Sequence, residues 1–178
     1  KGRWGNGFLV SLGICQGELS TTIIQLAQYT ALLANYGLTH EPHFVKGYID
    51  NKSDKFVPFE SKEVKVNIKK EYFDVVREGM YLVVNGAGTA THIKDSEIII
   101  AGKTGTSQNP HGADHALFIG FAPFDNPKIA IAVIVLNVGF GGTHAAPIAK
   151  EVIKAYLDKD KNKKIPKVDN NTIKLTGN

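Results

Sequence analysis

The chain has 178 residues, 43% hydrophobic and 21% charged, with a formal net charge of +4 at pH 7. This length suits one domain with a sizeable core, and the composition is that of an ordinary globular protein. No run reaches the ~18 apolar residues that a membrane-spanning helix needs. The C-terminal lysines alternate with aspartates, which favours a solvated tail over a nucleic-acid-binding patch.

The first part of the chain is predicted to form a helix followed by extended segments. Residues 21–36 carry apolar side chains at helical spacing. Thr22 and, three residues later, Gln25 match a capping box, and Gly37 is a natural stop. Residues 38–67 contain prolines and a polar turn, so they are predicted to form short extended pieces and loop.

A second helix is predicted at residues 68–85, closed by Gly86. Its hydrophobic spacing is that of an amphipathic helix with one buried face. The residues predicted to point inward are Tyr72, Val75, Val76, Met80 and Val83.

Three strands are predicted to follow, at residues 97–106, 116–121 and 128–138. The proline-rich turn at residues 123–127 favours an antiparallel pairing of the last two. The third strand is apolar on both faces, which indicates that other elements cover it on both sides.

The chain is predicted to end in a helix and a tail. The helix spans residues 143–157, with Pro147 tolerated in its first turn. Residues 159–178 are polar and are expected to form a flexible tail. This order of elements predicts an α/β protein of the α+β type, in which helices flank an antiparallel sheet.

The most informative segment is the end of the first predicted strand, where Lys103, Thr104, Gly105 and Thr106 follow three isoleucines. A cation, two hydroxyls and a glycine at a strand end suit an anionic ligand lying along the strand edge. A lone lysine after a hydrophobic strand is more commonly a solvated strand end. The flanking glycines and threonines favour the binding interpretation here.

Other kinds of site are disfavoured. A Walker A loop needs a glycine five residues before its Gly-Lys pair, but that position is Glu97, and three isoleucines follow it. His111 and His115 flank a carboxylate, yet they lie in a Pro-Gly loop with no suitably spaced third ligand, which disfavours a metal. Cys15 has no neighbour that would lower its pKa, so a packed thiol is expected rather than a nucleophile.

The Lys-Thr-Gly strand resembles the corresponding motif of the penicillin-binding proteins and serine β-lactamases. The likeness continues over nearly the whole chain to about residue 158. It is greatest to class B penicillin-binding proteins of the elongation-type penicillin-binding protein 2 group. The segments that carry it, in the family's order, are residues 13–18, 21–27, 88–90, 101–106, 114–123 and 145–149.

One departure from the family pattern concerns the nucleophile. The family's Ser-x-x-Lys and Ser-x-Asn motifs precede the Lys-Thr-Gly strand, and no serine ahead of Lys103 has lysine three residues later or asparagine two residues later. The resemblance therefore implies that residues 1–158 form the C-terminal portion of a transpeptidase domain, without the nucleophile and base. It also implies that an earlier strand of the domain lies beside residues 128–138.

The resemblance implies a serine D,D-transpeptidase that cross-links peptidoglycan through an acyl-enzyme, with this chain inactive alone. Its ligands would be the D-Ala-D-Ala end of a stem peptide and β-lactams. Thr104 and Thr106 would bind the ligand carboxylate, with Gly105 allowing close approach. Lys103 would supply charge, and the backbone N–H of Thr106 would form half of the oxyanion hole.

The resemblance also bears on the protein's setting and leaves alternatives. It implies the extracytoplasmic face of the inner membrane, an N-terminal anchor helix outside this chain, and cell-wall elongation proteins as partners. No cofactor, metal or nucleic acid is expected. The open alternatives are a D,D-carboxypeptidase, a β-lactamase-like hydrolase and a non-catalytic β-lactam-sensing module.

Overall fold

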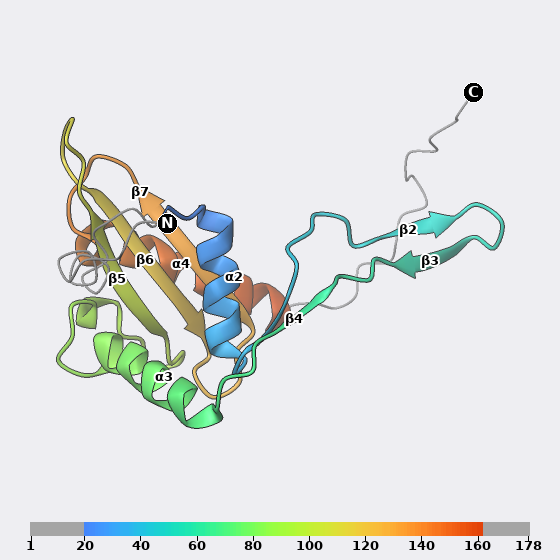
Figure 1. Cartoon of the computed structure of the whole chain (residues 1–178), viewed down its shortest axis with the longest axis horizontal. Helices are drawn as coiled ribbons and strands as arrows, with labels where there is room; N and C mark the ends of the chain where they lie inside the picture. The colour runs from blue at the N-terminus through green and yellow to red at the C-terminus, as the bar shows by residue number, and fades with distance from the viewer. Residues whose placement is uncertain (1–19, 162–178) are drawn as a thin grey trace, which may run out of the picture.

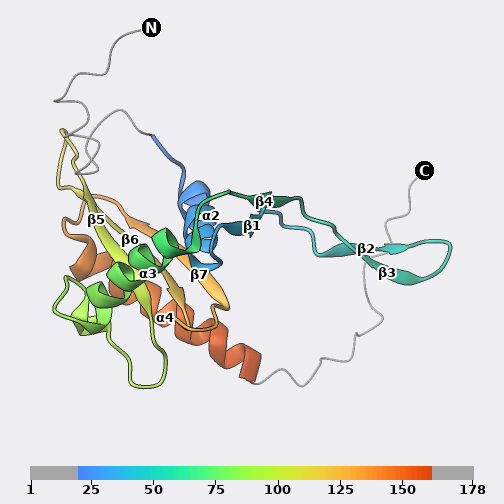
Figure 2. The ribbon, with the colours of Figure 1, turned by 60° about the horizontal axis from the view of Figure 1, so that its bottom comes forward.

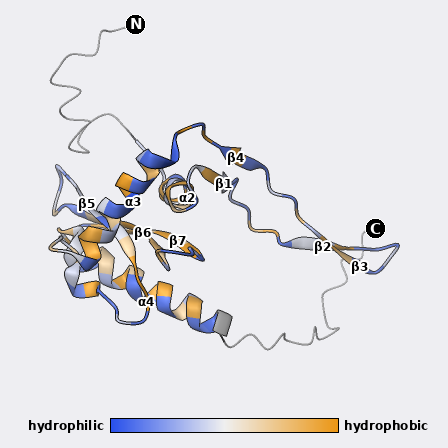
Figure 3. Cartoon of the chain, turned by 90° about the horizontal axis from the view of Figure 1, so that it is seen from below, coloured by the Kyte–Doolittle hydropathy of each residue, from blue (hydrophilic) through white to orange (hydrophobic). Residues whose placement is uncertain are grey.

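A three-stranded antiparallel sheet, in the order β5-β6-β7, organises the computed structural model, which describes residues 20–161 (Figure 1). Helix α2 covers one face of the sheet and helix α4 covers the other, while α3 packs against β5 (Figure 3). The predicted antiparallel sheet flanked by helices is therefore confirmed. The elements are α2 (Ile23–Ala34), β1 (Leu38–His40), β2 (Gly47–Asp50), β3 (Lys55–Pro58), β4 (Glu63–Lys65), α3 (Lys70–Asn85), the 3-10 turn η1 (Thr91–Ile93), β5 (Ala101–Ser107), β6 (His115–Ala122), β7 (Ile129–Val135) and α4 (Gly141–Lys161).

Helix α2 begins with the predicted capping box. The backbone N–H of Gln25 donates to the Thr22 hydroxyl at 3.3 Å, and the backbone N–H of Thr22 donates to the Gln25 side chain at 2.8 Å. The two bonds satisfy donors that a helix start otherwise leaves without partners. At the other end, the Gly37 N–H donates to the Leu32 carbonyl at 2.8 Å, so the helix stops where the sequence predicts.

Two hydrophobic clusters hold the layers together, one on each side of the sheet. Between the sheet and α4 lie Ile100, Phe118, Ala145, Ala149 and Ile153, all fully buried, with β7 side chains packed beside them. On the other side, Leu33 and Ala34 of α2 meet Phe73, Met80 and Phe121. The prediction that β7 is covered on both faces is confirmed.

Helix α3 buries a different face from the one predicted. Met80 is buried as expected, and Val83 is half-buried, but Tyr72, Val75 and Val76 are exposed by 58%, 72% and 43%. The buried positions are Phe73, Arg77, Met80 and Val84. Hydrophobic spacing predicts the wrong face of the helix, because one of the buried positions is occupied by the charged residue Arg77.

Two further element boundaries differ from the sequence prediction. Strand β5 starts at Ala101 rather than at residue 97, so the isoleucines precede it, with Ile98 and Ile100 buried. Helix α4 runs from Gly141 to Lys161, which places Pro147 beyond its first turn and carries the helix past residue 157. Residues 162–178 of the predicted tail lie outside the described residues.

Residues 38–68 form an arm that projects away from the sheet (Figures 1 and 2). Its short extended pieces were predicted, and they pair with one another: β1 with β4, and β2 with β3, both antiparallel. The arm exposes large side chains, among them Phe44, Tyr48 and Phe56. Within residues 20–161, no helix combines the length and apolar character needed to cross a membrane.

Candidate functional site

Strand β5 presents the Lys-Thr-Gly-Thr segment at an edge of the sheet. One side of β5 pairs with β6, where Lys103 is opposite Ile119 and Thr106 is opposite Ala116. No other strand among residues 20–161 pairs with β5. Its outer edge therefore offers backbone groups to an extended ligand, as in strand addition.

The four candidate residues are accessible to different degrees. Lys103 is exposed, and its ammonium group donates to the Thr104 carbonyl at 2.6 Å. Thr104, Gly105 and Thr106 are half-buried. The structure thus brings the predicted cation, both hydroxyls and the glycine together along one short strand segment.

The Thr104 hydroxyl is already engaged with another side chain. Its Oγ1 lies 2.7 Å from the Oγ1 of Thr89, which belongs to the loop between α3 and η1. Either hydroxyl can be the donor. In the sequence, Thr89 is notable only as part of the segment 88–90, which resembles the family. Its contact with Thr104 could not be predicted, because that contact depends on how the loop folds.

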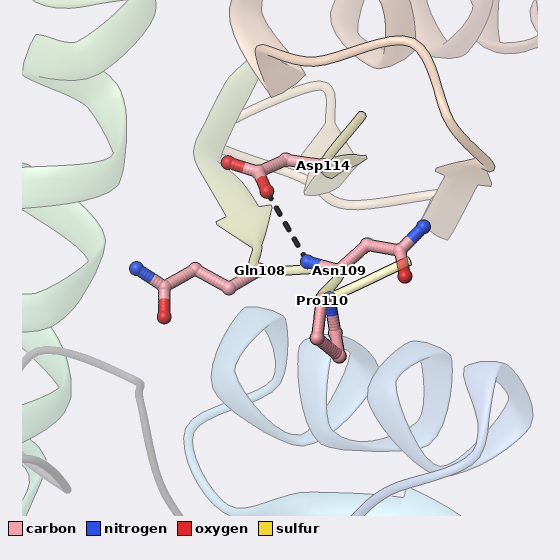
Figure 4. Close-up of a pocket in the computed structure, with 4 residues that line it drawn as sticks. All are labelled: Gln108, Asn109, Pro110 and Asp114. Carbon is pink, nitrogen blue, oxygen red and sulfur yellow. Dashed lines mark hydrogen bonds between the residues drawn. The ribbon is translucent and has the colours of Figure 1, made fainter. Parts of the chain in front are cut away.

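A shallow hollow lies beyond the end of β5 (Figure 4). It has a volume of about 560 Å³ and is lined by Gln108, Asn109, Pro110 and Asp114. The Asp114 carboxylate accepts a 3.2 Å hydrogen bond from the Asn109 N–H, which fixes the two sides of the β5–β6 loop. The lining residues come from the loop that joins β5 to β6, directly after the end of β5.

The two histidines of this region differ in their surroundings. His111 lies in the loop as predicted, whereas His115 is the first residue of β6 and pairs with Ser107 of β5. His115 accepts a hydrogen bond from the Asn137 N–H at Nδ1 (3.1 Å), whereas the His111 N–H donates to the Asn109 side chain (3.0 Å). Among residues 20–161, no group of three histidine, cysteine or acidic side chains is placed to hold a metal. Cys15 lies outside the described residues.

A nearly buried carboxylate anchors the segment that leads into β5. Asp95 accepts backbone N–H bonds from Glu97 and Ile98, and it forms ion pairs with Lys150 (3.2 Å) and Lys154 (3.3 Å) of α4. The Glu97 N–H and these lysines hold the pKa of Asp95 well below its usual range, despite the opposing effect of burial. The start of β5 is thereby tied to α4.

The arrangement suits recognition of a carboxylate on an extended peptide. Hydroxyl donors and a nearby ammonium satisfy a carboxylate with charge-assisted hydrogen bonds. The free edge of β5 has main-chain groups that an extended segment can hydrogen-bond to.

The sequence matches the penicillin binding protein transpeptidase domain over residues 1–154. The chain belongs to this family. It is 33% identical to a peptidoglycan D,D-transpeptidase MrdA of Haemophilus influenzae, over 98% of this chain and 29% of the relative. The chain therefore spans less than a third of the length of that relative.

Solved structures share the fold. Penicillin-binding protein 2 of Pseudomonas aeruginosa, crystallised with WCK 5153, is 43% identical, with a TM-score of 0.71 over 86% of this chain and 33% of that one. Penicillin-binding protein 2B of Streptococcus pneumoniae is 29% identical, with a TM-score of 0.73 over 88% of this chain and 28% of that one. Penicillin-binding protein A of Mycobacterium tuberculosis, an imipenem acyl-enzyme complex, is 29% identical, with a TM-score of 0.69 over 80% and 32%.

Proposed function

We propose that this chain is the substrate-carboxylate half of a serine D,D-transpeptidase active site, and that another part of the same polypeptide supplies the nucleophile. The observation that carries the proposal is the Lys-Thr-Gly-Thr segment on the free edge of β5, within a chain that belongs to the transpeptidase family. The chain contains no Ser-x-x-Lys sequence of its own.

In the proposed mechanism, the D-Ala-D-Ala end of a peptidoglycan stem peptide lies along β5. Thr104 and Thr106 donate hydroxyl hydrogen bonds to its terminal carboxylate, Gly105 leaves room for the backbone, and Lys103 adds positive charge. The serine hydroxyl attacks the penultimate carbonyl, and its proton passes to a base. The Thr106 N–H stabilises the oxyanion, and the base gives its proton to the amine of the terminal D-Ala, which leaves as the acyl-enzyme forms. The amine of a second stem peptide then attacks the acyl-enzyme carbonyl, and its proton passes through the base to the serine oxygen, which restores the serine.

The same geometry accounts for β-lactams as ligands, because they place a carboxylate beside a reactive carbonyl. The family relation supports a cell-envelope enzyme. We place its site on the extracytoplasmic face of the inner membrane, where the protein would act with cell-wall elongation proteins.

Mass spectrometry of intact protein after incubation with benzylpenicillin tests this assignment. The complete protein should gain one penicillin mass, and the 178-residue chain alone should gain none. A stable adduct on a serine of this chain would overturn the division of the active site. An unmodified complete protein would overturn the proposed function.

Acceptor use separates transpeptidation from hydrolysis. The complete protein, given a D-Ala-D-Ala donor peptide and an amine acceptor, should form the cross-linked product faster than the hydrolysed one. Predominant hydrolysis would favour the D,D-carboxypeptidase or β-lactamase-like alternatives. Acylation without turnover would favour a β-lactam sensor.

A further inference from the structure

A hydrogen bond between two hydroxyls joins β5 to the loop between α3 and η1, which is not part of the Lys-Thr-Gly motif. Thr89 Oγ1 and Thr104 Oγ1 are 2.7 Å apart, which is the usual length of an O–H···O hydrogen bond. Thr104 belongs to β5, and Thr89 precedes η1.

The loop that carries Thr89 is held on both sides by close backbone packing. A Cβ at Gly88 would collide with the backbone of Val83 in α3, and a Cβ at Gly142 of α4 would lie 2.6 Å from the Thr89 carbonyl oxygen. The next residue, Ala90, is fully buried, and its N–H donates to the Val83 carbonyl at 3.1 Å. The position of Thr89 is therefore fixed by α3 and α4 rather than by the ligand.

The direction of this hydrogen bond decides what Thr104 can offer a ligand. A hydroxyl has one proton to donate and two lone pairs to accept with. If Thr104 donated to Thr89, it would present only lone pairs toward an incoming carboxylate. If Thr89 donates, the Thr104 proton stays available, and the bond also fixes the side-chain rotamer.

We propose that Thr89 is a positioning residue, whose hydroxyl donates to Thr104 Oγ1 so that Thr104 is oriented to donate its own proton to the ligand carboxylate. This inference rests on the proposed function, because it assigns Thr104 to carboxylate recognition. Two hydroxyls in series also polarise one another, which strengthens the outer bond to an anion.

The test compares two ligands in the complete protein: benzylpenicillin and its methyl ester, which lacks the negative charge. Thr89→Val keeps the side-chain shape and removes the hydroxyl. It should lower the second-order acylation rate constant for benzylpenicillin about tenfold, the effect of losing one hydrogen bond's contribution. The rate constant for the methyl ester should change less than about twofold, and Thr89→Ser should restore the rate with benzylpenicillin.

Two further variants separate positioning from a general loss of structure. Thr91→Val makes the same chemical change at an exposed threonine in the adjoining 3-10 turn and should leave both rates unchanged. In a Thr104→Val background, Thr89→Val should have no additional effect, because the hydroxyl that it positions is gone.

Each outcome bears on one assignment. Equal losses with penicillin and ester, or additive effects of the two valine substitutions, would overturn the positioning role and leave the proposed function standing. Wild-type acylation rates in Thr89→Val would also overturn the positioning role without affecting the proposed function. A wild-type complete protein that penicillin does not acylate would overturn the proposed function, and this inference with it.

Discussion

The guanidinium group of Arg77 donates a 2.7 Å hydrogen bond to the carbonyl of Phe124, joining α3 to the turn that follows β6. The same group donates to the Ala34 carbonyl at the end of α2. Arg77 is only 3% exposed, and its charge lies over the rings of Tyr36, Phe121 and Phe124. A single buried cation thus links α2, α3 and the turn after β6, close to Phe121, which is paired with the first residue of β5.

Replacing Arg77 tests whether its hydrogen bonds or its aromatic contacts hold these elements together. Arg77→Met keeps much of the apolar contact but leaves two carbonyls without this donor, so we expect a loss of about 2 kcal/mol or more in the free energy of unfolding. Arg77→Lys keeps the charge and reaches fewer acceptors, so its loss should be smaller. Denaturant unfolding of the complete protein measures both. A methionine variant as stable as the wild type would show that packing alone is sufficient.

Asp95 predicts an acid-sensitive contact between α4 and the segment before β5. Its pKa is lower in the folded protein than the ~3.9 of an unfolded aspartate, so the unfolded chain takes up this proton first. The stabilisation is therefore complete above about pH 5 and is lost progressively as the pH falls through the folded pKa. Lys154 has a raised pKa because it bonds to Asp95, so its contribution persists until strongly alkaline pH.

The variant Asp95→Asn should consequently be less stable than the wild type at pH 7. The difference should narrow as the pH falls below about 4, because Asp95 of the unfolded wild-type chain then takes up a proton while the folded carboxylate stays ionised. Unfolding of both proteins at several pH values between about 7 and about 3 measures this. Glu97→Gln, an exposed neighbour, is the matched control for removing one charge. A stability difference that does not change over this range would contradict the assignment.

The order and type of the elements could be predicted from the sequence, whereas some boundaries and buried faces could not. Local signals placed α2, because the Thr22–Gln25 capping box acts within four residues. The strand at β5 was placed too early, since three isoleucines have strand character whether they pair or only pack into the core. The prediction of the buried face of α3 was wrong because Arg77 is buried. Its guanidinium group bonds to carbonyls more than 40 residues away in the sequence, which local spacing does not reveal.

The candidate site shows the same division between local and long-range information. Lys103 to Thr106 are contiguous, so a motif can locate them. Thr89 reaches Thr104 across 15 residues, and the packing of α3 and α4 determines that approach. Hydrogen bonds of this kind depend on tertiary structure and have no signature in sequence spacing.

Substitutions on β5 should distinguish two contributions to acylation of the complete protein: the positive charge of Lys103 and the binding of the ligand carboxylate by Thr106. Lys103→Ala should slow acylation by penicillin about 10²-fold, as expected on losing a preorganised positive charge at the site. Thr106→Ala should act mainly on carboxylate recognition, because its backbone N–H is retained. Stopped-flow acylation with a reporter β-lactam measures both. A Lys103→Ala rate within about threefold of the wild type would contradict the role given to the ammonium group.

The outer edge of β7 gives the last prediction. Its faces are covered by α2 and α4, yet within residues 20–161 its backbone pairs only with β6. Beyond the strand, Leu136 and Val138 remain exposed by 59% and 36%. A long apolar strand with free N–H and C=O groups recruits other chains.

We therefore expect the 178-residue chain to aggregate when purified alone, and to become soluble beside a polypeptide that supplies the neighbouring strand. Sedimentation velocity on the isolated chain measures this, and hydrogen exchange across residues 129–136 reports on the free edge. Ile134→Lys, which puts a charge at an exposed position of β7, provides a variant in which edge pairing is disfavoured. If the isolated chain is a stable monomer in dilute solution and the amides of β7 are fully protected from hydrogen exchange, the sheet needs no further strand.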